Sequence, residues 1–183
     1  MKIKNYKLKI NLGSMGITLI ELLVTMTIIA IISSTIFASR GNMENELALQ
    51  RAAYKLSQDF REAAEMAMGS GQGSCSVGKD VCGFGLYFEK STYGFFIDCA
   101  PGCDTSNHKK DGQDDIELRQ VVLEGDIEIP DTSPNKVDVL FCPPEPAIYI
   151  NGVEWDREAI MTLELNSETR NVRINSAGRI EIE

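Results

Sequence analysis

The amino-acid sequence predicts an α+β protein in which one long N-terminal helix packs against a C-terminal, mostly antiparallel β-sheet domain. Three observations support this prediction. An uninterrupted apolar stretch occupies residues 17–38, an amphipathic segment covers residues 39–69, and short alternating apolar segments separated by turn residues fill residues 70–183. Helical spacing and strand alternation are the signals of these two kinds of element. The 183 residues suffice for one domain with its own core.

The apolar stretch is long enough to cross a membrane. Residues 17–38 contain one charged residue, Glu21, and no glycine or proline. At 1.5 Å per residue they would form roughly 33 Å of helix, which spans the hydrocarbon core of a bilayer. The residues before this stretch contain no acid and four lysines, Lys2, Lys4, Lys7 and Lys9. By the positive-inside rule the N-terminus stays in the cytoplasm and the chain after Arg40 lies on the other side.

Two simpler interpretations of this region are a signal peptide and a plain membrane anchor. A signal peptide fits poorly, because the apolar run is too long and cleavage after Ala38 or Ser39 would place Ile36 or Phe37 where small residues are needed. A plain anchor leaves Glu21 unexplained. A carboxylate inside an apolar segment costs about 2.5–3.5 kcal/mol on insertion scales, so it requires a compensating partner. The anchor stays open as the alternative.

The segment from Gly16 to Val24, GITLIELLV, resembles the class III signal of type IV pilins and type II secretion pseudopilins. In that family a prepilin peptidase/N-methyltransferase cuts after the glycine and methylates the new N-terminus, which would be Ile17 here. The family's glutamate is the fifth residue after the cut, as Glu21 is. Phenylalanine is commonest at the position of Ile17, although other apolar residues occur. The resemblance makes residues 1–16 a leader.

This resemblance implies a role for Glu21 and a set of partners. Cleavage would create an ammonium at Ile17, and in a filament the carboxylate of one helix can pair with the amine of a neighbour, which favours one axial register. The expected partners are the peptidase, an inner-membrane assembly platform, and other pilins or pseudopilins bound through the helix. Membrane lipid surrounds the helix before assembly. The expected location is the inner membrane, with an extracytoplasmic C-terminal domain, and then the pilus or pseudopilus.

The amphipathic segment is predicted to continue the membrane helix after a soft point at Gly41 and to end at the glycines that begin with Gly69. Its apolar residues recur every three or four positions: Leu49, Ala53, Leu56, Phe60, Ala63, Ala64 and Ala67. The strands expected after it are 84–88 and 93–97, which form a hairpin, then 116–123, 127–129, 137–141 and 147–150. Alternating segments around 161–165, 172–174 and 180–182 complete the sheet.

The tail from Val172 to Ile180, VRINSAGRI, resembles the closing hairpin of the GspH/FimT branch of minor pilins and minor pseudopilins. Some members of that branch linked to DNA uptake present a basic cluster at this turn. Here Arg173 and Arg179 are followed by Glu181 and Glu183. The formal charge is -9, and the chain beyond residue 16 has fourteen basic against twenty-seven acidic residues. Such a surface repels phosphate backbones, so we do not expect DNA binding.

The five cysteines predict disulfide bonds if this part of the chain is exported, with one cysteine left over. Cys99 and Cys103 flank a Pro-Gly pair suited to a tight turn, and Cys75 and Cys82 flank another glycine-bearing loop. Local bonds, above all Cys99 to Cys103, are therefore the expected connectivity. Pairing of Cys142 with one of the other four cysteines stays open as an alternative. A zinc site with His108 is the alternative, but the paired C-x2-C spacing is missing.

Chemistry beyond disulfide bonding finds little support in the sequence. The acidic stretch 111–117 suggests calcium but fails the EF-hand spacing, because Leu118 stands where the bidentate glutamate belongs. His108 is the single histidine, and nucleophile-elbow, zinc-protease and phosphate-loop motifs are absent from the sequence. We therefore expect no enzyme, no cofactor and no metal site.

Together these features predict a minor pilin or pseudopilin, a structural subunit that helps initiate or complete a type IV pilus or a type II secretion pseudopilus. The alternatives are a major pilin and a tip pilin that binds DNA or a surface.

Overall fold

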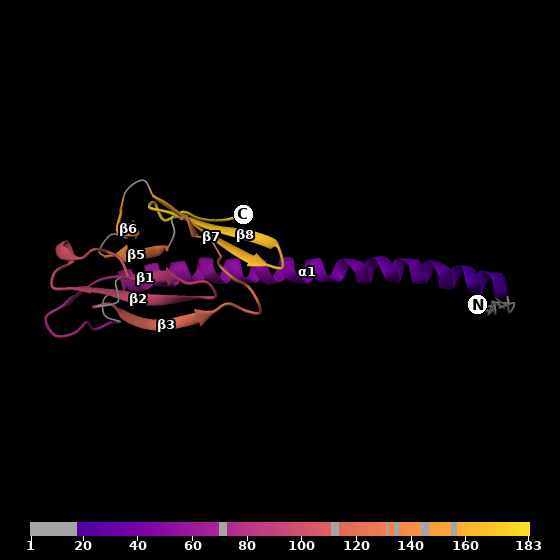
Figure 1. Ribbon diagram of the computed structural model, residues 1–183, viewed down its shortest axis with the longest axis horizontal. Coiled ribbons are helices and arrows are strands. Elements are labelled where there is room, and N and C mark those ends of the chain that lie inside the picture. Colours follow the sequence, from indigo (N-terminus) through magenta and orange to yellow (C-terminus); the bar gives the residue numbers. More distant parts are fainter. Residues whose placement is uncertain are drawn as a thin grey trace, which may run out of the picture. The chain divides into compact units, whose positions relative to one another are not determined.

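The computed structural model describes residues 18–69, 73–110, 114–130, 132–133, 136–143, 147–154 and 157–183, and only the backbone of residues 38–42 (Figure 1). It contains one α-helix, α1 (Leu19–Met68), and two antiparallel sheets, so the predicted α+β class is confirmed. The chain divides into two compact units, Met1–Gly41 and Asn42–Glu183. The first contains the apolar part of α1, and the second contains the rest of α1 with all the described strands.

The second part of α1 buries one stripe of its surface. Residues Leu49, Ala53, Leu56, Phe60, Ala63 and Ala67 are all at most 5% exposed. Their three- and four-residue spacing places them on one face of a helix, as the sequence predicts. The helix ends at Met68, directly before Gly69, whose N–H donates to the Glu65 carbonyl at 2.8 Å. The predicted end of the helix is therefore confirmed.

The larger sheet has five strands in the order β3-β2-β1-β5-β6. Its strands are β1 (Asp80–Phe88), β2 (Thr92–Ala100), β3 (Ile116–Val122), β5 (Asp138–Cys142) and β6 (Ala147–Ile150). Every pairing is antiparallel. The predicted hairpin is confirmed, because β1 pairs with β2 from Phe88–Tyr93 to Asp80–Ala100 around a three-residue turn. A β-bulge between Val81 and Gly83 leaves Cys82 outside the ladder.

The smaller sheet has four strands in the order β4-β7-β8-β9. These are β4 (Thr132–Ser133), β7 (Glu158–Leu165), β8 (Glu168–Asn175) and β9 (Ile180–Ile182), and a short 3-10 helix, η1 (Cys103–Thr105), lies between β2 and β3. The strand predicted at 127–129 is wrong. Only Glu128 forms a bridge there, by exchanging two backbone hydrogen bonds with Glu164, while Ile127 and Ile129 on either side are buried.

The two faces of the five-stranded sheet differ. Its inner face packs with the stripe of α1 and with β7 and β8 in one core, which includes Phe84, Leu86, Phe95, Ile97, Val139 and Phe141. Its outer face carries a separate small cluster of Tyr87, Phe96, Leu140 and Cys142, with Ala147 and Tyr149 beside it. Strand alternation explains the division, because neighbouring residues point to opposite faces.

Candidate functional site

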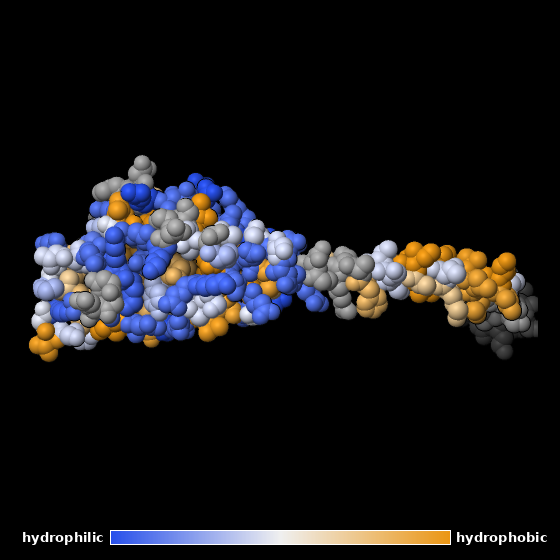
Figure 2. Space-filling view, viewed as in Figure 1, coloured by the Kyte–Doolittle hydropathy of each residue, from blue (hydrophilic) through white to orange (hydrophobic). Residues whose placement is uncertain are grey.

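The N-terminal part of α1 is long and apolar enough to cross a membrane. The candidate span is Leu19–Phe37. Its large apolar side chains are between 48% and 83% exposed. Figure 2 shows apolar residues along this segment, whereas the visible face of residues 42–183 is mostly hydrophilic. An exposed apolar surface of this extent is typical of a segment that lies in lipid or packs against another protein.

Three threonine hydroxyls of this segment are satisfied within the helix itself. Thr25, Thr27 and Thr35 each donate to the carbonyl three residues earlier, at 2.9, 2.8 and 2.8 Å. Because no water is available inside a bilayer or a dry helix bundle, polar groups there must find partners on the same element or its neighbours. The threonines are therefore compatible with an apolar environment.

Glu21 lies in the first turn of α1 and is the one charged residue between Leu19 and Phe37. Its backbone N–H donates to Oγ1 of Thr18 at 3.3 Å, so Thr18 satisfies one of the free amides at the start of the helix. A carboxylate in the first turn is also favoured by the helix dipole. The predicted cleavage site at Gly16 and Ile17 lies outside the described residues.

The four predicted disulfide cysteines are bonded, but with a different connectivity from the expected one. Cys75 pairs with Cys99 and Cys82 pairs with Cys103, with Cα–Cα distances of 5.8 and 5.0 Å. The expected Cys99–Cys103 bond is therefore wrong. Cys99 belongs to β2 and faces the inner core, whereas Cys103 lies in η1 on the outer side. Strand alternation directs Cys99 away from the turn that follows it.

Cys142 is the cysteine left over, and it is buried on the outer face. Its Sγ lies 3.9 Å from Nδ1 of His108, which is itself 3.3 Å from Oδ2 of Asp98. The Ser106 hydroxyl donates to the same Asp98 oxygen at 2.6 Å. Asp98 is only 2% exposed, and the hydrogen bond from the Ser106 hydroxyl compensates for its burial. Nothing in the sequence places Asp98 and Cys142 together.

These contacts fasten one loop to the outer face of the sheet. The loop, residues 101–110 (called the outer loop below), is tied to β1 by the Cys82–Cys103 bond. The His108 ring packs on Tyr149 at a centroid distance of 4.0 Å. At the far end of the loop, a Cβ on Gly152 would lie 2.5 Å from the Asn107 carbonyl oxygen. The outer loop therefore passes so close to the turn after β6 that position 152 requires a glycine.

Cysteine, histidine and aspartate together suggest nucleophilic catalysis, but this geometry does not suit it. Cys142 and Asp98 both approach Nδ1 of His108, so one nitrogen would have to serve as base and as the orienting donor. Burial, and then the Asp98 and Glu154 charges, raise the pKa of the Cys142 thiol to about 12. The thiolate needed as a nucleophile is therefore scarce at neutral pH.

The two metal alternatives also meet specific obstacles. Four of the five thiols are used in disulfides, which leaves Cys142 as the one thiol near His108. Of the acidic stretch, Asp111 lies outside the described residues, Asp114 forms an ion pair with Lys79, and Asp115 accepts the Cys99 N–H at 3.4 Å. Within the described ranges, groups of three or more metal-binding side chains do not occur.

The arginines of the C-terminal hairpin are paired with carboxylates. Arg173 lies 3.2 Å from both Glu158 and Glu183, and Arg179 forms an ion pair with Glu181.

Comparison with protein-family models, with curated proteins and with solved structures finds no match. The candidate functional site therefore rests on the chain's own features, above all the exposed apolar helix with its single carboxylate.

Proposed function

We propose that this chain is a type IV pilin-like subunit, a minor pilin or pseudopilin that helps to initiate or complete a type IV pilus or a secretion pseudopilus. In this proposal the leader, residues 1–16, is removed after Gly16 and Ile17 becomes the methylated N-terminus. The observation that carries the proposal is Glu21. It is the single charge in an exposed apolar helix, in the first helical turn and five residues beyond Gly16.

The energetic argument concerns the carboxylate in an apolar surrounding. An unpaired Glu21 is costly in lipid and in a packed bundle of helices, whereas the new ammonium at Ile17 of a neighbouring subunit offers an opposite charge. The pair forms at one axial offset between helices, so it selects a register. Association through the remaining apolar surface is less selective, because apolar contacts have no direction.

Two further features support the proposal. Met43, Leu47 and Tyr54 are 59%, 44% and 54% exposed, and their spacing places them on one exposed face of α1, opposite to the buried stripe. Such a face suits packing against another helix. The two disulfides fit an oxidising compartment, as the proposed export of residues 42–183 requires.

The decisive test is intact-mass measurement of the chain extracted from membranes of cells that contain a prepilin peptidase. The expected mass lacks residues 1–16 and includes one added methyl group. Gly16→Leu should retain the leader, because the resemblance requires a small residue at the cut. Gly13→Leu, a matched change inside the leader, should be processed normally. A retained leader in the wild type, or a cut near Ala38, would favour the membrane anchor or the signal peptide instead.

A minor subunit is distinguished from a major one by stoichiometry. In sheared filaments this chain should be present at a small fraction of the most abundant pilin. If it is the dominant band, the major-pilin alternative is correct. Arg173 and Arg179 are both paired with carboxylates, which would compete with DNA phosphates for their charge. These ion pairs support a structural role over that of a DNA-binding tip.

A further inference from the structure

Three of the five cysteines meet on the outer side of the five-stranded sheet. The bonded pair of Cys82 and Cys103 lines one cavity of about 590 Å³ together with the free Cys142. In the antiparallel β1–β5 ladder the partner of Phe84 is Phe141. Cys82 precedes the first of these residues by two positions and Cys142 directly follows the second, so the pairing brings both cysteines to the same end of the ladder. A free thiol therefore lies beside a disulfide with which it can exchange.

The two disulfides of this chain are interlaced. Along the sequence the bonded cysteines are Cys75, Cys82, Cys99 and Cys103, and the structure joins the first to the third and the second to the fourth. These bonds have sequence separations of 24 and 21. Local bonds between sequence neighbours would close much shorter loops, and the entropic cost of closing a loop grows with its length. Local bonds therefore form first when the unfolded chain is oxidised.

The folded sheet does not accept the local bonds. Cys99 faces the inner core at the end of β2, whereas Cys103 lies in η1 on the outer side. Folding therefore favours the interlaced bonds, but disulfides exchange only when a thiolate attacks one of their two sulfurs. When four of the five cysteines are in local bonds, Cys142 is the remaining thiol of the chain.

We propose that Cys142 is an internal exchange thiol, which converts the local disulfides into the interlaced ones while the chain folds. Its thiolate attacks Cys82 in the local bond, so that a Cys82–Cys142 bond forms and Cys75 leaves as a thiolate. Cys75 then attacks Cys99, which forms the first native bond and releases Cys103. Finally Cys103 attacks Cys82, which forms the second native bond and returns the thiolate of Cys142.

The conversion is balanced in electrons and protons. Each step forms one S–S bond and breaks one, so no oxidant or reductant is consumed. The proton that Cys142 releases to water before the first step is taken up again after the last. The last step requires Cys82, Cys103 and Cys142 at one place, and these three line the same cavity in the folded protein. The proposal concerns residues 42–183 and does not depend on processing at Gly16 or on assembly into a filament.

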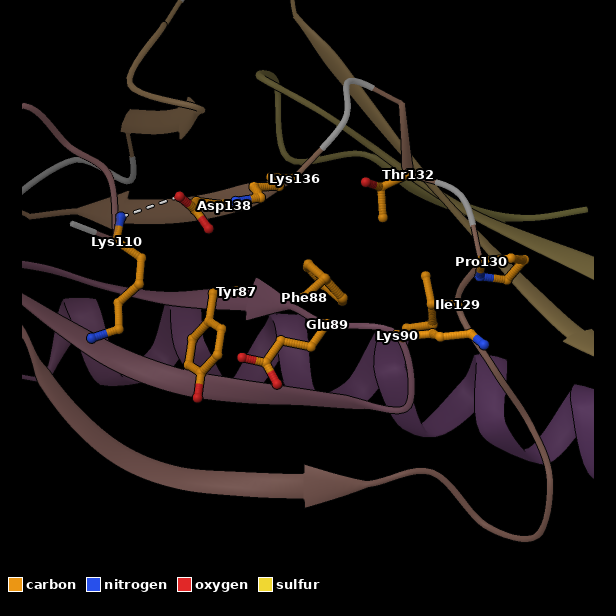
Figure 3. Close-up of a pocket in the computed structure, with 10 residues that line it drawn as sticks. All are labelled: Tyr87, Phe88, Glu89, Lys90, Lys110, Ile129, Pro130, Thr132, Lys136 and Asp138. Atoms are coloured by element: carbon orange, nitrogen blue, oxygen red, sulfur yellow. Dashed lines mark hydrogen bonds between the residues drawn. The ribbon is translucent and has the colours of Figure 1, made fainter. Parts of the chain in front are cut away.

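The folded structure also ends the exchange. The outer loop is held against β5, the strand of Cys142, by a hydrogen bond of 3.2 Å from the Lys110 N–H to Asp138, which Figure 3 shows. His108 of the same loop places Nδ1 3.9 Å from the Cys142 sulfur. Burial raises the pKa of the Cys142 thiol to about 12. The attacking thiolate therefore becomes scarce once the outer loop is in place, and the interlaced bonds persist.

The test follows the conversion alone, apart from the oxidation that precedes it. The reduced full chain is oxidised in urea with diamide, which takes two electrons from each pair of thiols and releases no thiol. The chain with local bonds is isolated by reversed-phase chromatography in acid, where exchange stops because thiolates are protonated. Folding is then started in a zwitterionic detergent at mildly alkaline pH, without oxidant or added thiol.

Tryptic maps of acid-quenched samples, made without reduction, identify each species. At the start, peptide 62–79 should be joined to 80–90, with 91–109 closed on itself. A species that joins all three peptides should replace them as the interlaced bonds form. Samples taken during the conversion should also contain 80–90 joined to 137–157, which marks the intermediate bond of Cys142.

Cys142→Ser should convert at least about tenfold more slowly than the wild type, because an internal thiol acts at a high effective concentration. Reduced glutathione at about 1 mM should restore the conversion, which shows that this variant can still reach the interlaced state. Cys142→Ala is a second variant in case serine destabilises the buried position. Tyr149→Phe changes another residue of the same cavity but keeps the thiol, and it should convert at the wild-type rate.

Three results would overturn the proposal. The first is equal conversion of the wild type, Cys142→Ser and Cys142→Ala without glutathione. The second is a majority of interlaced bonds already in the chain oxidised in urea, since no conversion would then be needed. The third is a rate that falls when the protein is diluted about tenfold, because an internal thiol acts independently of protein concentration.

Discussion

The hydroxyl of Tyr93 donates a 2.5 Å hydrogen bond to Oδ2 of Asp59, which joins β2 to α1 inside the core. Asp59 is 8% exposed, and Arg119 of β3 lies 3.6 Å from its other carboxylate oxygen. Arg119 also lies over the Phe95 ring, 4.0 Å from its centre. Burial first, and then the hydrogen bond to Asp59, raise the pKa of Tyr93, so the phenol remains a donor at physiological pH.

Tyr93→Phe should lower the free energy of unfolding by about 2 kcal/mol, because the buried Asp59 carboxylate loses its strongest donor. Urea unfolding of the full chain in detergent, followed by circular dichroism, measures the change. Tyr54→Phe removes a hydroxyl from an exposed tyrosine on α1, the helix that contains Asp59, and should have almost no effect. Equal losses for the two variants would mean that the Tyr93–Asp59 bond contributes nothing specific.

The disulfide connectivity predicts a distinctive tryptic map without reduction. Peptides 62–79, 80–90 and 91–109 should be found as one species joined by two bonds, because Cys99 and Cys103 share the third peptide. Local bonds would instead give two species. Fragmentation before Pro101 then separates Cys99 from Cys103 and assigns each partner. With sequence separations of 24 and 21, loss of either bond should cost about 3 kcal/mol on the chain-entropy estimate.

Cys142 should be the one thiol in the oxidised protein, and it should react only after unfolding. The thiol is 8% exposed and its pKa is raised to about 12, so thiolate is scarce at pH 7.5. Iodoacetamide should label the native chain at least about a hundredfold more slowly than the same chain in urea. Glutathione serves as the reference for an ordinary thiol. Rapid native labelling would show that the outer loop opens readily.

Asp138 predicts a pH dependence of stability with a definite sign. Burial raises the pKa of Asp138 from 3.8 to about 6, and the charge of Asp115 raises it further. The hydrogen bond from the Lys110 N–H and the charges of Lys109 and Lys110 lower this pKa, but burial outweighs them. The folded state therefore holds the proton more tightly than the unfolded chain. Stability from this group is present below pH 4 and is lost as the pH rises through 6.

Asp138→Asn removes the titration, so its stability relative to the wild type should rise by about 2 kcal/mol between pH 4 and pH 7. Chemical unfolding at several pH values measures this difference. Asp126→Asn, at an exposed position, is the matched control and should show no such trend. A flat difference for Asp138→Asn would place the carboxyl in a more solvated site than the structure indicates.

Glu21→Ala should spare membrane insertion and folding of residues 42–183 but impair entry into filaments. Removing a charge from an apolar segment eases insertion, whereas in the proposed filament an amine left without its partner costs about 3–5 kcal/mol. Immunoblots of the membrane and filament pools measure the effect. Thr27→Ala, which changes a hydroxyl bonded within its own helix, is the control. Normal filament entry of Glu21→Ala would favour the plain membrane anchor.

The sequence by itself determined the local elements. The apolar run, the amphipathic spacing and the glycines after Met68 predict α1 and its end, because helix periodicity and termination depend on residues within a few positions of each other. The β1–β2 hairpin and the alternating strands β7 and β8 were predictable for the same reason. The leader and its cut at Gly16 stay predictions, since these residues lie outside the described part of the chain.

The tertiary structure decided what joins distant positions. The division into two sheets, the failure of 127–129 to form a strand, and the pairing of Cys75 with Cys99 all depend on how strands meet across the core. The Asp98, His108 and Cys142 cluster likewise needs the outer loop folded onto the sheet. Such contacts follow from register and packing between segments, and spacing along the chain carries no information about which distant faces come together.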